Sequence, residues 1–463
     1  MMPGFPSPLT AVPSDSPYVA DASGFRGWAD AVFTPASEAE VLDIIRHAVR
    51  DKVAITVAGA GSGLTGGRVA QGGWVVSLEK FNRLEIAPGR ARAGAAVTLL
   101  QLRDAALRTG QFYAPDPTEI TASVGGTIAT NASGARSFRF GSTRRHVLAL
   151  RVAQMDGRIA EYRRGDKVDF LLPRIPTPKT TKSTAGYPLA PDMDWIDLFC
   201  GSEGTLGIVL EAELALLPAP DQLFSAVVFF DRDELALDAV DAWRSVPDLR
   251  MLEYVGPEAL DLIRSRYPEI PSAAQAALLI EAGDPVDLDA WAARLVEAAA
   301  RSDDSWFAVS SADRERFRKF RHALPEVVNA TVLQRGFMKM GTDYAVPVER
   351  NREMLGFYRE LLRAELPGAY VIYGHIGDAH VHVNMLPASE PEAATATALL
   401  KEFARQAVAL GGTVSAEHGL GKRKAHLLKL QYSPEHIQSM MDVKRRLDPD
   451  WLLGRGTLFD YAV

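Results

Sequence analysis

Three of the nine histidines of this 463-residue chain lie within eight residues of one another, at His375, His380 and His382. From His380 to Met385 polar and apolar residues alternate, so a strand would place His380, His382 and Asn384 on one face. Such a face is either a polar edge open to solvent or a metal site. Imidazole and carboxylate ligands without a thiolate suit Zn²⁺ or another divalent ion.

A second group of polar residues could supply the carboxylate ligand of such a metal site. Glu417 and His418 lie in a glycine-bounded loop that follows Gly411 and Gly412. Adjacent Glu and His residues can place a metal ligand next to a general base. Taken alone, the two groups are also compatible with a metallohydrolase, in which Zn²⁺ keeps an open position for water.

A glycine-rich loop offers a different kind of chemistry. Residues 61–66 match the pattern G-x-G-x-x-G, and Gly59 and Gly67 extend it. A Rossmann fold would need a helix directly after this pattern, but Gly72 and Gly73 follow, and then an apolar strand at residues 74–78. The loop is therefore either a mobile turn or a nest of backbone N–H groups that binds phosphate.

Three segments together resemble the flavin-contacting segments of the FAD-linked oxidase family, which includes vanillyl-alcohol oxidase and the D-lactate and D-2-hydroxyglutarate dehydrogenases. They are the glycine loop, residues 115–141 with their Ala-Ser-Val-Gly-Gly-Thr-Ile-Ala run, and residues 200–208, Cys-Gly-Ser-Glu-Gly-Thr-Leu-Gly-Ile. Residues 58–67 contain no histidine, so we expect FAD without a covalent link. The resemblance implies flavin contacts from Gly59, Ala60, Gly61, Ser62, Gly63, Leu64, Thr65, Pro115, Ser123, Gly125, Gly126, Thr130, Asn131, Gly134, Gly141, Glu203, Gly204, Gly207 and Ile208.

The histidine clusters resemble those of the hydroxy-acid dehydrogenase branch of this family. That branch implies His375, His382 and Glu417 as ligands of a divalent metal, with Zn²⁺ expected, and His418 as the catalytic base. It also implies Arg321, Lys339 and Asn384 as substrate contacts. The branch usually has Gly-Asn where this chain has Ala379 and His380, so His380 is either an additional ligand or a replacement for His375.

The expected function is FAD-dependent oxidation of a D-2-hydroxy acid, such as lactate, 2-hydroxyglutarate, malate or glycolate, to the 2-oxo acid. Electrons would pass to a separate acceptor: a quinone, a cytochrome or an electron-transfer flavoprotein. Two alternatives stay open. One is an ether-lipid (alkylglycerone phosphate) synthase, which uses FAD without net oxidation, and the other is a non-catalytic subunit that binds flavin.

Helices and strands must position these residues. Ser37 and Glu40 have the spacing of a capping box before an apolar stripe, which predicts the first helix. Beyond a linker at residues 218–221 the pattern predicts strands, with helices on one face of their sheet. We expect strands at 225–230, 251–255, 276–282 and 306–309, and helices at 234–244, 288–300, 314–333 and 434–447.

The expected fold class is α+β: a two-subdomain FAD-binding domain of the vanillyl-alcohol oxidase type and a cap domain with an antiparallel sheet covered by helices. We expect a loose leader at residues 1–29 and the FAD-binding domain at 30–217. The substrate- and metal-binding cap would span 218–420, and a helical segment at 421–463 would return to the FAD-binding domain.

Composition narrows the class of protein. The net charge of −7 argues against nucleic-acid binding, and no apolar run approaches the roughly 20 residues that span a bilayer. A single cysteine, Cys200, excludes an internal disulfide framework. The first 25 residues lack Lys and Arg and do not resemble a secretory signal. We therefore expect a cytoplasmic protein, or one peripheral to a membrane, and a homodimer is compatible with the sequence.

Overall fold

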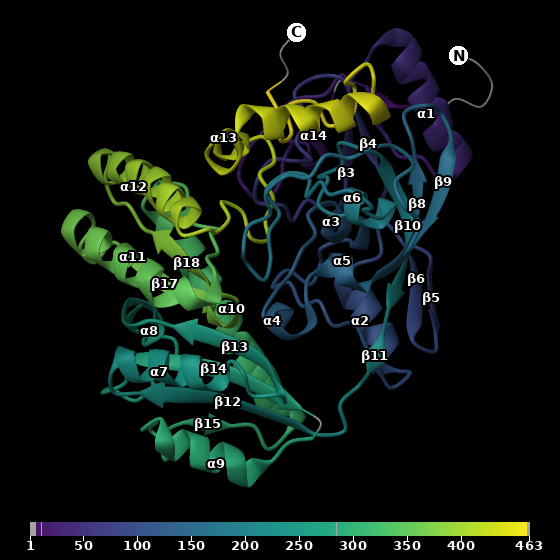
Figure 1. Ribbon diagram of the computed structural model, residues 1–463. Helices are drawn as coiled ribbons and strands as arrows, with labels where there is room; N and C mark the ends of the chain where they lie inside the picture. Colours follow the sequence, from purple (N-terminus) through teal and green to yellow (C-terminus); the bar gives the residue numbers. More distant parts are fainter. Residues whose placement is uncertain (1–5, 11, 284, 461–463) are drawn as a thin grey trace.

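The computed structural model describes residues 6–10, 12–283 and 285–460, which form two lobes in contact (Figure 1). One lobe contains a four-stranded sheet, in the order β1-β2-β4-β3, and a five-stranded sheet, β5-β6-β10-β8-β9. The other contains a seven-stranded sheet, β15-β12-β14-β13-β17-β18-β16. This combination agrees with the α+β class.

The four-stranded sheet holds the start of the glycine loop. It consists of β1 (Leu9–Thr10), β2 (Ala31–Phe33), β3 (Ile55–Ala58) and β4 (Trp74–Ser77). Helix α1 (Glu38–Asp51) packs on it with its apolar stripe, and Ser37 caps the helix by accepting a hydrogen bond from the Glu40 N–H. Strands β3 and β4 are parallel, and residues 59–73 between them contain no helix. The exclusion of a Rossmann helix is therefore confirmed.

The described part of the N-terminal leader is packed rather than loose. Strand β1 pairs with β2, and the 3-10 helix η1 (Pro17–Val19) buries Val19 completely. Arg68 donates a hydrogen bond to the Pro17 carbonyl, and the Gly66 N–H donates one to Asp21. The expectation of a loose leader is wrong because these backbone and side-chain contacts tie it to the glycine loop.

The five-stranded sheet of the same lobe is antiparallel throughout. Its strands are β5 (Leu84–Ala87), β6 (Arg90–Gly94), β8 (Val147–Ala153), β9 (Ile159–Arg163) and β10 (Ile208–Ala215). A two-stranded pair, β7 (Gln111–Phe112) and β11 (Leu217–Pro218), lies where the chain leaves this lobe. The short helices of this lobe are α2 (Leu99–Leu107), α3 (Val124–Ala129), α4 (Ser137–Phe140), α5 (Thr143–His146) and α6 (Trp195–Phe199).

The cap is built on the seven-stranded antiparallel sheet. Its strands are β12 (Leu223–Phe230), β13 (Leu249–Val255), β14 (Ala276–Gly283), β15 (Trp306–Phe307), β16 (Met340–Gly341), β17 (Tyr370–His375) and β18 (His380–Met385). Its helices are α7 (Asp233–Trp243), α8 (Pro257–Ile263), α9 (Leu288–Glu297), α10 (Ser311–Gln334), α11 (Asn351–Glu365) and α12 (Glu390–Ala409), with the 3-10 turns η2 (Val348–Arg350) and η3 (Ile376–Asp378).

Helices cover both faces of the cap sheet, so the expectation of helices on one face is wrong. Phe230 of β12 packs against Trp243 of α7 on one face. Its neighbour Phe229 points to the other face and packs on Trp306, which contacts Phe320 of α10. Strands β12 and β14 are buried on both faces, which explains why their apolar residues run without alternation.

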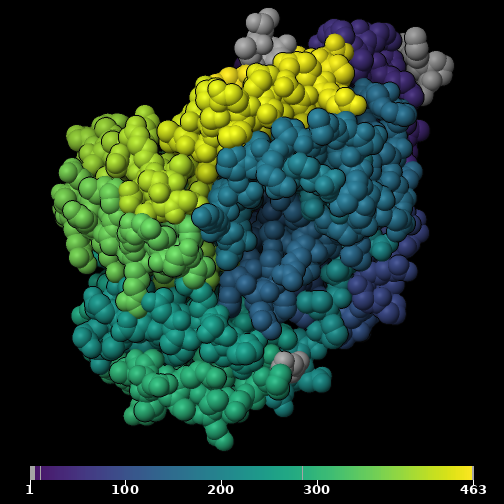
Figure 2. Space-filling view, in the orientation of Figure 1, coloured from purple at the N-terminus to yellow at the C-terminus, as the bar shows by residue number. Residues whose placement is uncertain are grey.

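The C-terminal segment returns to the first lobe through η4 (Ala425–Leu427), α13 (Leu428–Gln431) and α14 (Pro434–Leu447). In Figure 1 the yellow α14 lies across the top of this lobe near α1, and in Figure 2 the yellow segment covers its surface. The buried Lys444 ammonium of α14 donates hydrogen bonds to the Leu453 and Thr205 carbonyls. Among the described residues, no helix has the length and apolar character to cross a membrane.

Candidate active site

A cavity of about 610 Å³ lies where the two lobes meet. The first lobe supplies most of its walls, through the glycine loop and the loops around α3 and before β10. The cap and the loop after α12 supply His375, Glu417 and His418. One cavity therefore joins the predicted flavin segments to the predicted catalytic residues.

Most of the predicted flavin contacts line this cavity. They are Gly59, Ala60, Gly61, Ser62, Gly63, Leu64, Thr65, Ser123, Gly125, Gly126, Thr130, Gly134, Glu203, Gly204, Gly207 and Ile208. Pro115, Asn131 and Gly141 do not line it. The Asn131 side chain instead accepts a hydrogen bond from the Arg144 N–H, and Gly141 ends α4 with a φ of 81°. These two residues therefore shape the lobe rather than the cavity wall.

Two glycines of the loop adopt backbone conformations that suit an anion-binding turn. Gly61 and Gly66 have φ values of 85° and 77°, which favour glycine. A side chain at Gly61 would also meet the Arg68 guanidinium, which packs directly on that glycine. Positive φ values between ordinary residues turn successive N–H groups inward, as a diphosphate requires.

Arg68 is a cavity residue that the sequence reasoning missed. Among the described lining residues it is the only Arg or Lys. Its guanidinium donates hydrogen bonds to the Gly59 and Pro17 carbonyls, 2.9 Å away in both cases. The sequence could have indicated Arg68, because it directly follows Gly66 and Gly67. A cation next to a phosphate-binding loop attracts the negative charge of the phosphate.

The β17–β18 hairpin positions the histidines. His375 ends β17, His380 begins β18, and the two face each other in register. The hairpin turns through η3 and Ala379, whose φ is 51°. His382 follows two residues later on β18 and faces the same cluster, as the alternation predicts.

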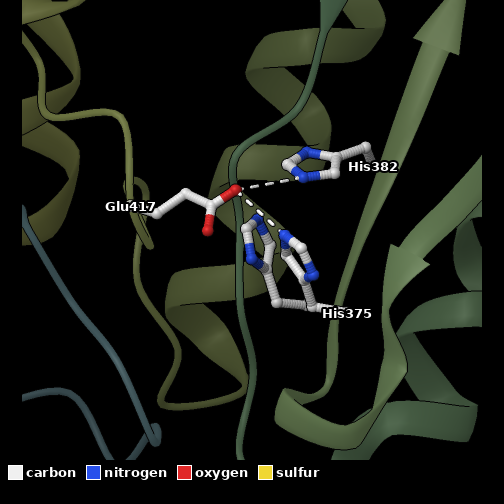
Figure 3. Close-up of side chains that lie close together, drawn as sticks. His375, His382 and Glu417 are labelled. Carbon is white, nitrogen blue, oxygen red and sulfur yellow. Dashed lines mark hydrogen bonds and ion pairs between the residues drawn. The ribbon is translucent and has the colours of Figure 1, made fainter. Parts of the chain in front are cut away.

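Three ligand atoms converge in this cluster (Figure 3). Glu417 Oε1 lies 3.2 Å from His375 Nε2 and 3.3 Å from His382 Nε2. Zn²⁺ bonds of about 2.0–2.1 Å in a tetrahedral arrangement place neighbouring ligand atoms about 3.3 Å apart. The observed spacing therefore fits a divalent ion.

The remaining polar atoms of these three residues have protein partners. His375 Nδ1 donates to Glu253 Oε1 at 2.6 Å, and His382 Nδ1 donates to the Thr342 carbonyl at 3.0 Å. Glu417 Oε2 accepts from Ser133 Oγ at 3.1 Å and from Lys182 Nζ at 3.2 Å. Hydrogen bonds of this kind orient the residues that bind a metal. Here they leave His375 Nε2, His382 Nε2 and Glu417 Oε1 facing one another.

Buried charges surround the cluster. The Lys182 side chain is 1% exposed and also lies 3.4 Å from Asp378 Oδ2. Burial opposes ionisation of Glu417, but the charges of Lys182 and His375 hold the pKa of Glu417 well below its usual value. Burial alone would lower the pKa of His375, but the Glu253 carboxylate outweighs it and raises the pKa to about 9. A metal would therefore displace a proton from His375.

Asp343 fixes the loop that carries Glu417 and His418. This fully buried carboxylate accepts hydrogen bonds from the His418 N–H at 3.0 Å and from Ser415 Oγ at 2.8 Å. Asp343 Oδ1 lies 3.5 Å from His418 Nδ1. Burial lowers the pKa of His418 to about 4 despite the nearby carboxylates. His418 is therefore neutral at pH 7 and able to accept a proton.

Glu253, Lys182 and Asp343 escaped the sequence reasoning. Each is a single charged residue without a neighbouring motif. For Glu253 the weak signal was a carboxylate inside the apolar strand β13, because buried carboxylates need partners.

None of the three predicted substrate contacts lines the cavity, and Arg321 reaches the cluster through Glu253. Arg321 Nε donates to Glu253 Oε2 at 2.9 Å, and a second nitrogen contacts Thr118 Oγ1 at 3.3 Å. Part of the Arg321 guanidinium is therefore occupied by protein. Lys339 is exposed and forms no ion pair with a described residue, and it lies with Asn384 next to Gly341 of β16.

Comparisons with known proteins agree with this arrangement. A family described as FAD linked oxidases, C-terminal domain, matches residues 220–458. A family described as FAD binding domain matches residues 29–163. The first match covers the cap and the C-terminal segment, and the second covers the glycine loop.

Three relatives of similar length are named as dehydrogenases or as an oxidase subunit. The D-lactate dehydrogenase of Archaeoglobus fulgidus is 32% identical over 92% of this chain and 90% of its own length. The glycolate oxidase subunit GlcD of Bacillus subtilis is 29% identical over 94% and 90%, respectively. The D-2-hydroxyglutarate dehydrogenase of Xanthomonas citri is 29% identical over 93% and 89%.

Solved structures show the fold. An alkyldihydroxyacetonephosphate synthase in two crystal forms aligns with TM-scores of 0.65 and 0.67, at 16% and 15% identity. Both alignments cover 93% of this chain and 76% of the synthase. The expected vanillyl-alcohol oxidase type of FAD-binding domain with a second domain is confirmed. This chain belongs to the FAD-linked oxidase family and is an FAD-linked oxidoreductase.

Proposed function

We propose that this protein oxidises a D-2-hydroxy acid to the 2-oxo acid with noncovalent FAD and a divalent metal. The single observation that carries the proposal is the shared cavity, which is lined by the flavin segments and by His375, Glu417 and His418. A hydrolase would have no use for the flavin segments. The names of the relatives supply the substrate class.

The two bound groups would supply the chemistry that side chains lack. Bound FAD would accept the C2 hydrogen with its two electrons as a hydride. A divalent ion, for which we expect Zn²⁺, would act as a Lewis acid on the substrate hydroxyl. His375, His382 and Glu417 are the residues that would hold the ion, and the absence of histidine from the glycine loop favours noncovalent flavin.

The protein residues would bind the acid and move its hydroxyl proton. Neutral His418 accepts this proton, and Asp343 holds the His418 backbone in position through the His418 N–H. Lys339 supplies a positive charge for a carboxylate, with Asn384 as a polar neighbour. Arg321 is a carboxylate anchor in the same proposal, although its bond to Glu253 gives it an alternative role in holding His375.

Stereoselectivity follows from the number of fixed substituents. If the site holds both the hydroxyl and the carboxylate on C2, two of the four substituents of C2 are fixed. Only one enantiomer then points its C2 hydrogen at a flavin that lies on one side of the substrate. Relatives named for D-lactate and D-2-hydroxyglutarate favour the D hand. Malate and glycolate remain within the proposed class.

We also propose a separate electron acceptor, which is a quinone, a cytochrome or an electron-transfer flavoprotein. We further propose that the protein is a homodimer and that it is located in the cytoplasm or peripherally at a membrane.

Turnover with a dye as acceptor tests the proposed reaction against its alternatives. A D-2-hydroxy acid should reduce the dye catalytically, with the 2-oxo acid as product. An ether-lipid synthase would show no net oxidation, although the fold of the alkyldihydroxyacetonephosphate synthase is similar. A non-catalytic subunit would bind FAD and reduce no dye with any of the four acids.

A further inference from the structure

We propose that His380 is a third imidazole ligand of the metal site formed by His375, His382 and Glu417. The inference rests on the proposed function, because it concerns the same metal. The contacts that orient His375, His382 and Glu417 do not include His380, so they give no reason for a histidine at this position. The carrying observation is a buried imidazole without hydrogen bonds at the edge of a cluster of converging ligands.

The environment of His380 lacks the partners that a buried imidazole needs. The residue is 0% exposed, and neither ring nitrogen has a hydrogen-bond partner among the described residues. Nε2 has one close polar neighbour among the described residues, Asp343 Oδ1 at 3.3 Å, and Nδ1 has no hydrogen-bond partner there. A buried polar group without a partner costs about 1–3 kcal/mol, and an absent ion is one of its accepted explanations.

The position of His380 suits a ligand. One ligand atom from each of His375, His380, His382 and Glu417 can be chosen so that all four lie within 4.8 Å of one another. The ring of His380 lies 4.5 Å from that of His382 and 5.5 Å from that of His375, measured between centroids. The hairpin register, which pairs His375 with His380, holds the two rings on the same side of the strands.

The contacts of His380 also differ from those of the neighbouring histidines. His375 and His382 each donate from Nδ1 to a protein oxygen and face Glu417 with Nε2. His380 approaches Asp343 with Nε2 and leaves Nδ1 without any close partner among the described residues. Asp343 thus lies beside Nε2, and Nδ1 is the ring nitrogen that stays available to an ion.

A third imidazole changes which ions the site prefers. Three nitrogen donors and one carboxylate favour Zn²⁺, Ni²⁺ or Co²⁺ over Mg²⁺, which prefers oxygen ligands. We therefore expect Mg²⁺ to be a poor substitute for Zn²⁺ in the protein, and a better one after His380 is replaced.

The test measures Zn²⁺ affinity and the number of imidazole ligands in the FAD-loaded protein. Affinity comes from competition with a fluorescent chelator, and Zn K-edge X-ray absorption counts the imidazoles. His380→Asn should weaken Zn²⁺ binding at least about tenfold and reduce the count from three to two. His426→Asn, which changes an exposed histidine outside the cluster, should alter neither quantity.

Each outcome decides the proposal. Two imidazoles in the unaltered protein, or a Zn²⁺ affinity of His380→Asn within about threefold of it, would overturn the role of His380 and leave the metal site standing. No Zn²⁺ binding by the unaltered protein would overturn the metal part of the proposed function as well. Retained flavin and an unchanged unfolding temperature without metal show that the variant is folded, and His380→Gln replaces it if it is not.

Discussion

Replacing Glu253 with glutamine should weaken metal binding at high pH and reduce its dependence on pH. Glu253 Oε1 accepts a hydrogen bond from His375 Nδ1 at 2.6 Å, so the charge of Glu253 stabilises both the protonated and the metal-bound imidazole. In the absence of metal this charge raises the pKa of His375 to about 9 although burial opposes it. Proton and metal therefore compete for His375 at neutral pH.

The sizes of the two effects can be worked out. With a pKa of about 9, deprotonating His375 at pH 7 costs about 2.7 kcal/mol, which weakens metal binding about 100-fold relative to its value above pH 9. Loss of a carboxylate that orients a ligand costs about 10- to 100-fold in metal affinity. Glu253→Gln removes most of the proton competition and also the orientation. At pH 9.5 the unaltered protein should bind metal about 10- to 100-fold more tightly than the variant. At pH 7 the unaltered protein loses about 100-fold to the proton, so the variant should bind equally well or up to about tenfold more tightly.

The assay is chelator competition for Zn²⁺ at pH 7 and pH 9.5, with unfolding temperature measured in parallel. Glu281→Gln is a matched control, because Glu281 is a buried carboxylate of the same sheet that pairs with Arg136 at 2.8 and 2.9 Å. Glu253→Gln takes the paired carboxylate from the largely buried Arg321 and should cost about 3–5 kcal/mol of stability. Glu281→Gln should cost less, because Arg136 keeps Asp116 at 3.7 Å. Only Glu253→Gln should change metal affinity.

Arg321 has two possible roles: it could anchor the substrate carboxylate, or it could hold Glu253 against His375. The same experiment tests the second role. The double variant Glu253→Gln, Arg321→Gln removes both charges and should regain stability without regaining metal affinity. Equal Zn²⁺ affinities at pH 9.5, or the same pH dependence in the variant and the unaltered protein, would refute the reasoning about Glu253.

Four further predictions concern other parts of the site. His418→Ala should keep metal and flavin but slow anaerobic flavin reduction by about 10²- to 10⁴-fold; loss of metal would instead make His418 a ligand. Lys339→Ala should impair oxidation of the diacids D-2-hydroxyglutarate and D-malate more than that of D-lactate, with exposed Lys319→Ala as the control; no change for diacids would remove Lys339 from the substrate site. Arg68→Ala should lower the affinity for FAD but not for riboflavin, which lacks the diphosphate; an equal loss for both would make Arg68 a structural residue. Burial raises the pKa of Glu203 from 4.5 to about 7, so the folded chain holds a proton that the unfolded chain releases. Its contribution to stability, about 3 kcal/mol, should be present below pH 4.5 and be lost as pH rises through 7, and Glu203→Gln should remove this part of the pH dependence of urea unfolding.

Local patterns in the sequence were sufficient for the elements that carry the site. Ser37 and the apolar stripe after it predict α1, and the structure has both the cap and the buried face. Alternation from His380 to Met385 predicts β18 and the shared side of its polar residues. Both predictions use contacts between residues close in sequence, which a single chain displays.

Contacts between distant segments could not be predicted in the same way. His375 meets Glu253 across 122 positions of sequence, and Lys182 meets Glu417 across 235. No periodicity links such residues. The pairing of β13 with β17 inside the cap sheet brings Glu253 to His375, and the packing of the two lobes brings Lys182 to Glu417. The helices on both faces of the cap sheet were predictable in principle, since the unbroken apolar runs of β12 and β14 are typical of strands buried on both sides.

The most direct test of the proposed function is anaerobic flavin reduction by the two hands of one acid. FAD-loaded protein, supplied with Zn²⁺, is mixed with D-lactate or L-lactate without oxygen, and the flavin absorbance is followed over time. D-lactate should bleach the flavin, L-lactate should not, and removal of the metal by a chelator should slow the bleaching. D-2-hydroxyglutarate, D-malate and glycolate are tested in the same way. Faster bleaching by L-lactate than by D-lactate, or no bleaching by any of these acids, would contradict the proposal.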